Sequence, residues 1–290
     1  MKRFWQTLKA QAARIMVALE KNQAFRFLQR LLRKWGEDDA GDRAGAIAFY
    51  AFVSIFPLLL GVISILGFFL PDQDIRNAVS EAIVQILPGS VDFIEQTLES
   101  VIELRGSNGI LSIVGLIWTG SNLFAALRRA LNRAWGLKHE RNFIIGKIRD
   151  LAMVLGTGLL LLLSMALTNA INLVDEANFG PFYPLLAFGS LLIGFLLTLA
   201  VFAILNRYQP NKPVSWRFTW PGALLSTVLF QAGTYIFVFY LSNFADYQSI
   251  YGPLGSVIVL LIWIYASAVI LLLGVVINSV SYEQSTTHKK

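Results

Sequence analysis

Hydrophobic residues gather into six long runs, which are separated by shorter polar segments. The runs cover residues 47–70, 108–127, 151–174, 182–205, 220–243 and 253–280. A helix needs about 20 apolar residues to cross the hydrocarbon core of a bilayer. Since no run contains an acidic residue, a lysine, an arginine or a histidine, each can enter lipid at low cost. The pattern predicts an all-α polytopic membrane protein with six transmembrane helices within residues 47–280.

The positive charges between the runs alternate in density. Of the 24 lysines and arginines, only Arg76 and Arg105 fall outside four segments, which are 1–46, 128–150, 206–219 and 281–290. Short loops rich in lysine and arginine stay in the cytoplasm. We therefore expect both termini to be cytoplasmic, with residues 1–46 as an N-terminal segment and 281–290 as a short tail.

Two segments outside the runs have the period of an amphipathic helix. Residues 1–34 combine apolar positions such as Trp5 and Leu19 with many cations, which is typical of a helix on an anionic membrane surface; the alternative is a solvated helix packed on the bundle. Between the first two runs, Pro88-Gly89 separates two amphipathic stretches. We predict a helical hairpin on the outer face, which either caps the helix ends or forms a lid over a cavity.

Composition argues against a soluble enzyme. Charged residues make up 14% of the chain and the mean hydropathy is +0.59, whereas soluble domains contain about 25% charged residues. The chain has no cysteine, and His139 and His288 both lie in predicted cytoplasmic segments. We expect no catalytic site, metal site or cofactor, and no nucleic-acid partner despite the net charge of +6. The cluster of Glu37, Asp38, Asp39 and Asp42 has the chemistry of a cation site, but a solvated helix start is the favoured interpretation.

Uncharged polar residues within the runs are the candidates for function. Buried polar groups in lipid face the bundle interior or a wet cavity, and the alternative is hydrogen bonding between helices. One further candidate, Tyr251, lies just before the last run. The candidates for a polar cavity are therefore Tyr50, Ser54, Pro57, Thr119, Asn122, Asn169, Asn172, Gln231, Tyr235, Tyr251 and Asn278. Proton relays usually use an ionisable residue at membrane depth. The absence of one from the runs disfavours such a carrier.

Several short motifs resemble the YihY/BrkB family of bacterial inner-membrane proteins. They run in order along the chain as Ala48-Phe49-Tyr50 with Ser54 and Pro57-Leu58-Leu59, Ala130-Leu131-Asn132 with Trp135, Pro210-Asn211, Pro221-Gly222-Ala223, Tyr251-Gly252-Pro253-Leu254-Gly255, and Trp263-Ile264-Tyr265 with Leu273-Gly274 and Asn278. The resemblance implies a six-helix protein of the bacterial inner membrane with a transporter-like role. The chain departs from the pattern at Val276, where family members often carry an acidic residue. The family's former ribonuclease BN label does not fit these residues.

Three hypotheses follow for function. The leading one is a transporter or lipid-handling protein, whose partners are membrane lipids and whose route is a polar cavity in the bundle. The second is a membrane scaffold that binds a partner, and the least expected is a ribonuclease that acts through residues 128–149. Two further points stay open from the sequence: whether the halves form an inverted repeat, and whether pairs such as Ala152/Gly156 and Ser190/Gly194 pack within one chain or between chains.

Overall fold

The computed structural model describes residues 22–66, 118, 120–137, 144–150, 152, 153, 156, 160, 183–211, 214–243 and 254–287. It describes only the backbone of 56–66, 183–187 and 190. The helices are α2 (Gln23–Glu37), α3 (Ala40–Leu66), α8 (Tyr183–Tyr208), α9 (Trp216–Asn243) and α11 (Gly255–Thr287). Two shorter pieces are called helix 120–134 and helix 144–150 below. These residues contain no strand, so the predicted all-α class is confirmed for the described part of the chain.

Three of the described helices are long and apolar enough to cross a membrane. The qualifying stretches are Leu191–Tyr208, Trp216–Asn243 and Gly255–Thr286, and they correspond to the last three predicted spans. Residues 47–66 of the first predicted span form most of α3. The predicted hairpin and residues 1–21 lie outside the described residues, and six spans remain a prediction.

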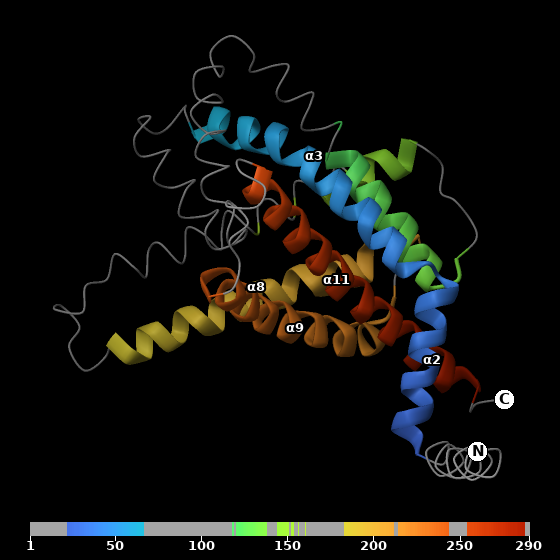
Figure 1. Cartoon of the computed structure of the whole chain (residues 1–290). Helices are drawn as coiled ribbons and strands as arrows, with labels where there is room; N and C mark the ends of the chain where they lie inside the picture. The colour runs from blue at the N-terminus through green and yellow to red at the C-terminus, as the bar shows by residue number, and fades with distance from the viewer. Residues whose placement is uncertain are drawn as a thin grey trace, which may run out of the picture.

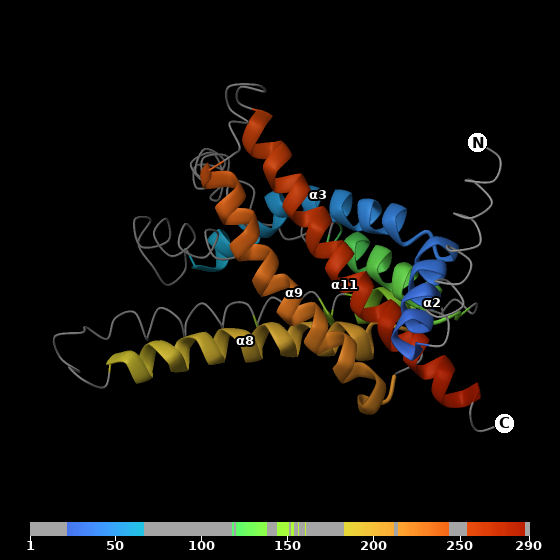
Figure 2. The ribbon, with the colours of Figure 1, turned by 60° about the horizontal axis from the view of Figure 1, so that its bottom comes forward.

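Helix α11 is the centre of the assembly. It packs against α9, α3 and α2, while α8 packs against α9. Figures 1 and 2 show helix 120–134, in green, running beside α3, and α2 lying beside the C-terminal end of α11. The N-terminal half of α3 and the C-terminal half of α11 contribute to the apolar core of the described residues.

Small side chains allow these helices to approach closely. Ala40 and Ala44 of α3 and Ala126, Ala130 and Ala134 of helix 120–134 are all buried in one apolar cluster. Each set recurs every four residues, which places it on one face of its helix. Small residues at helix contacts bring backbones close enough for dense packing, which is the main attraction between helices in lipid.

Large apolar side chains cover the outside of the assembly instead. On α8, Phe188 and Leu191 are each 65% exposed, and on α9, Ile236 is 68% exposed. An exposed apolar face of this kind marks a contact with another protein or with membrane. On helices long enough to span a bilayer, it is the surface that lipid covers.

Candidate functional site

The described candidates on α3 are held by their own helix. Ser54 is buried, and its hydroxyl donates a 2.7 Å hydrogen bond to the backbone oxygen of Tyr50. This bond to the residue four positions earlier satisfies a hydroxyl in apolar surroundings. Tyr50 itself is half-buried, and Pro57 lies in the helix at a position whose side chain is not described.

The two candidates on α9 do not share an environment. Gln231 is half-buried, whereas Tyr235 is 67% exposed and lies on the outer surface of the assembly. The structure therefore separates Tyr235 from the polar residues in the core. Thr119, Asn169, Asn172 and Tyr251 lie outside the described residues, and their cavity role stays a prediction.

Asn278 joins three helices. Its Oδ1 accepts a 2.7 Å hydrogen bond from the backbone N–H of Gly222. Its Nδ2 donates to Oδ1 of Asn206 at 3.2 Å and to the backbone oxygen of Thr219 at 3.2 Å. Asn278 is fully buried, so its side chain ties α11 to α8 and α9 at the point where Pro221 interrupts the hydrogen-bond pattern of α9.

Glycines make this crossing of α9 and α11 very tight. A Cβ atom on Gly222 would lie 2.5 Å from Nδ2 of Asn278, and one on Gly274 would lie 2.5 Å from the backbone oxygen of Gly222. Nearby, the hydroxyl of Ser226 donates a 2.9 Å hydrogen bond to the backbone oxygen of Ile270. The motifs around Pro221-Gly222 and Gly274 thus meet in space and fix one helix crossing.

A different polar cluster lies where helix 120–134 meets helix 144–150. The Nζ of Lys147 donates to the hydroxyl of Ser121 at 2.6 Å and to Oδ1 of Asn122 at 3.4 Å. It also lies 5.7 Å from the centre of the Trp118 ring. The candidate Asn122 therefore has a positively charged neighbour, Lys147. The sequence alone assigned Lys147 to a cytoplasmic segment.

Next to it is a buried ion pair. Arg128 Nη1 lies 2.8 Å from Oδ2 of Asp150, and the Asp150 side chain is 1% exposed. Gly146, one turn before Asp150, leaves room for the guanidinium, because a Cβ there would lie 2.9 Å from Arg128 Nη1. We call Ser121, Asn122, Arg128, Lys147, Asp150 and Gln209 the helix-end cluster.

Gln209 connects this ion pair to the end of α8. Its Nε2 donates to the backbone oxygen of Phe124 at 2.6 Å and to Oδ1 of Asp150 at 3.3 Å. Gln209 is 1% exposed, and its Oε1 has no hydrogen-bond donor among the described residues. A buried acceptor without a donor is costly, which singles out this end of the cluster as a place for an additional donor.

Burial raises the pKa of the Asp150 carboxyl above its ordinary value of 3.8, against the opposing effects of Arg128, the Gln209 hydrogen bond and Lys147. The folded protein therefore holds this proton at a pH at which the unfolded chain has lost it. The resulting contribution to stability is fully present below the ordinary pKa and is lost as the pH rises through the raised one.

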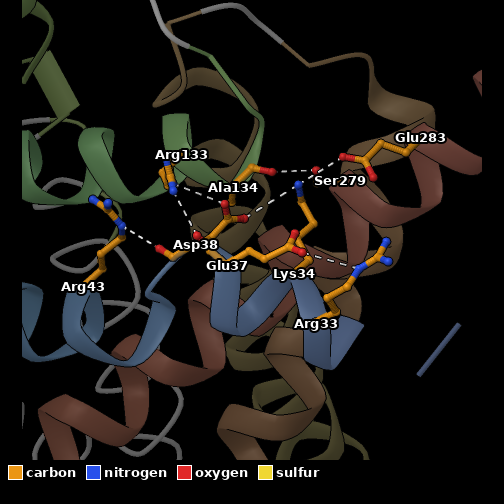
Figure 3. Close-up of polar contacts among 9 residues, drawn as sticks. All are labelled: Arg33, Lys34, Glu37, Asp38, Arg43, Arg133, Ala134, Ser279 and Glu283. Carbon is orange, nitrogen blue, oxygen red and sulfur yellow. Dashed lines mark hydrogen bonds and ion pairs between the residues drawn. The ribbon is translucent and has the colours of Figure 1, made fainter. Parts of the chain in front are cut away.

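A second charged group centres on Asp38 (Figure 3). Its carboxylate lies 3.7 Å from Lys34 Nζ and 3.4 Å from Arg133 Nε, and its backbone oxygen accepts a 2.8 Å hydrogen bond from Arg43. Asp38 is 8% exposed, so the interpretation as a solvated helix start is wrong for this residue. Glu37, Asp39 and Asp42 are exposed as expected.

These contacts gather several helix ends into one region. Arg133 Nη2 donates to the backbone oxygen of Glu37, and the Ser279 hydroxyl donates to that of Ala134. Asn132 Oδ1 accepts a hydrogen bond from the backbone N–H of Asn211. The described residues of the predicted cytoplasmic segments that make these contacts therefore lie at one end of the assembly. The leaflet that this end faces remains a prediction from charge.

Sequence reasoning selected only Asn122 from the helix-end cluster, because each of the other members looks ordinary in its own segment. One signal was present: Asp150 is an acid directly beside an apolar run, in a segment that otherwise carries mainly cations. The described residues contain no group of three acidic or histidine side chains able to hold a metal ion. The side chains of the helix-end cluster can form ion pairs and hydrogen bonds.

Long helices with an exposed apolar surface and polar groups gathered at their ends are typical of an all-α integral membrane protein. Within that class, residues 31–290 match the family model described as virulence factor BrkB. The chain belongs to this family, as the sequence motifs predicted. Val276, the position at which the resemblance predicted a departure from the family pattern, is 1% exposed and forms part of the apolar core.

Similar proteins occur in other bacteria. The ribonuclease-like protein YfkH of Bacillus subtilis is 27% identical over 89% of this chain and 96% of its own length. A UPF0761 membrane protein of Glaesserella parasuis is 31% identical over 64% of this chain and 66% of its own length. One from Pseudoalteromonas atlantica is 27% identical over 86% and 83%. No solved structure shows significant similarity to the chain.

Proposed function

We propose that this protein is a transporter-like protein of the bacterial inner membrane, which moves or handles a lipid or a small solute along a polar route between its helices. The proposal rests chiefly on the buried Arg128–Asp150 ion pair. Burial of the Asp150 carboxylate costs several kcal/mol, which its pairing with the partly exposed Arg128 offsets. A buried ionisable group with a specific charged partner is a candidate for a functional site.

The neighbours of the ion pair support a route that begins at the helix-end cluster. Asn122 and Lys147 place polar groups on the half-exposed side of the cluster. Gln209 adds a buried acceptor that has no donor among the described residues. A substrate that moves past these groups exchanges hydrogen bonds with them in place of water, which lowers the cost of leaving the aqueous phase.

Reconstitution tests this proposal. Purified protein is placed in liposomes, and the transfer of fluorescent lipids and of a panel of small solutes is measured against empty liposomes. We expect Asp150→Asn to reduce transfer by at least about tenfold, the factor that corresponds to 1.4 kcal/mol. Ser242→Ala, on an exposed hydroxyl bonded within α9, is the control and should leave transfer unchanged.

Two further results decide the interpretation. Asp150→Asn leaves the Arg128 charge without its partner, so the double variant Arg128→Gln/Asp150→Asn separates loss of function from loss of folding. If this double variant is stable and transfers substrate at the wild-type rate, the ion pair is not part of the route. If wild-type protein transfers none of the lipids or solutes above the rate of empty liposomes, the transport proposal fails.

A membrane scaffold is the second candidate, and one observation favours it. Ser226 and Asn278, two buried polar residues of the helix core, form hydrogen bonds between helices, as in a packed protein without a route. A scaffold predicts that deletion of residues 1–34 abolishes recovery of a partner in a pull-down from membranes. Ribonuclease activity is least supported, because Arg128 and Arg133 of the basic segment are engaged in contacts between helices.

A further inference from the structure

We propose that Lys147, Asn122 and Trp118 form a binding site for the phosphate headgroup of an anionic phospholipid. The inference names a ligand class for the helix-end cluster, and in that sense it deepens the proposed function. It depends on binding alone and can hold even if the protein moves no substrate. Three observations carry it, namely the charge, the available hydrogen-bond donors and the adjoining apolar surface.

The first observation is a net positive charge. Two cations, Arg128 and Lys147, act on the single carboxylate of Asp150, which lies 2.8 Å from Arg128 Nη1. The other partners of Lys147 among the described residues are neutral: the Ser121 hydroxyl, the Asn122 amide oxygen and the Trp118 ring. Lys147 is half-buried, so its charge is screened less than that of a surface lysine. A bound anion is the natural partner for this ammonium group.

The second observation is a set of donors on one side of the site. The Asn122 amide oxygen accepts from Lys147, which orients the amide and leaves Nδ2 without a partner among the described residues. An ammonium group and an amide N–H₂ therefore lie next to each other. Phosphate oxygens are strong acceptors, and hydrogen bonds between charged partners are about twice as strong as neutral ones.

The third observation is apolar surface directly beside Lys147. Ile144, Ile145 and Ile148 of the same short helix are 66%, 57% and 64% exposed, and Trp118 is 68% exposed. Ile144 and Ile148 are four residues apart and lie on one face of the helix, next to Lys147. Tryptophan favours the headgroup level of a bilayer. A phospholipid can contact the polar part of this surface with its phosphate and the apolar part with its acyl chains, whereas free phosphate contacts only the polar part.

Lipid binding can be measured on the whole protein in a neutral detergent. Phosphatidylglycerol is titrated against the purified protein, and its apparent dissociation constant is obtained from the shift in thermal unfolding. We expect Lys147→Gln to weaken binding about tenfold, the loss expected for one charge-assisted contact of about 1.4 kcal/mol. Lys147→Arg keeps the charge and should bind within about threefold of wild type, by the same conversion.

Arg129→Gln is the matched control, because Arg129 is an exposed cation on helix 120–134 next to the ion-paired Arg128. It should bind like wild type. Equal affinity for Lys147→Gln and wild type overturns the site. A Lys147-dependent shift produced by inorganic phosphate or by an RNA oligonucleotide, but not by phosphatidylglycerol, overturns the assignment to lipid. If lipid binding depends on Lys147 but the protein transfers nothing in liposomes, the binding site is supported and the transport proposal is refuted.

Discussion

The α9–α11 crossing provides the sharpest test of the packing. Gly222→Ala adds one methyl group where the two helices are closest. The added Cβ would lie inside contact distance of the Gly274 backbone oxygen, 2.5 Å from Asn278 Nδ2 and 2.6 Å from Asn278 Cγ. Two of these neighbours belong to a buried side chain that bonds α8 and α9 as well, so it cannot move aside without breaking those bonds.

The magnitude of the effect follows from two contributions. Extra atoms in a packed core usually cost about 1–3 kcal/mol. If the helices separate to admit the methyl group, the bonds from Gly222 N–H to Asn278 and from Ser226 to Ile270 lengthen or break, at about 0.6 kcal/mol each in a membrane protein. We expect the free energy of unfolding to fall by about 2–4 kcal/mol on these figures.

The assay is unfolding of purified protein in mixed micelles of neutral detergent and dodecyl sulfate, followed by tryptophan fluorescence. Gly194→Ala is the control: this glycine lies in α8, within another candidate span, and a Cβ atom added there would meet no atom of the described residues within 4 Å. Alanine there should stabilise the helix by about 0.5–1 kcal/mol. A Gly222→Ala protein as stable as wild type would refute the tight crossing.

Three more predictions concern single contacts. Asn278→Ala should lower the free energy of unfolding by about 1–3 kcal/mol, because it leaves the buried Gly222 N–H without an acceptor; unchanged stability in the same micelle assay would count against this role. The thermal midpoint should fall as the pH rises from 3.8 through the raised pKa of Asp150. Asp150→Asn should reduce the dependence of the midpoint on pH only in part, since burial raises the pKa of Asp38 as well. An unchanged dependence on pH would contradict the raised pKa of Asp150. Ser279→Ala should cost about 0.5–1.5 kcal/mol through its lost bond to Ala134, and Ser242→Ala should cost nothing measurable; equal effects of the two variants in urea or dodecyl sulfate unfolding would show that the contact is not formed.

The candidate residues show how much of the site can be predicted from the pattern of residues along the chain. It identified Asn278 as a buried polar residue, and the structure buries it completely. It selected both Gln231 and Tyr235 as cavity candidates, yet Tyr235 is 67% exposed, because the neighbouring helices cover only part of α9. Which part they cover depends on the crossing angle at Gly222 and Gly274, and this angle is set by two segments about fifty residues apart in sequence.

The amino-acid sequence by itself determined the all-α class, the family and the apolar stretches of α8, α9 and α11. These properties depend on sums over neighbouring residues, since insertion into lipid is governed by the hydrophobicity of one continuous helix. Only the tertiary structure decided that Asp150 pairs with Arg128, that Asp38 lies beside Arg133, and that Lys147 lies beside Asn122. Each of these contacts joins separate segments, and its energy depends on burial and distance, which no single segment carries.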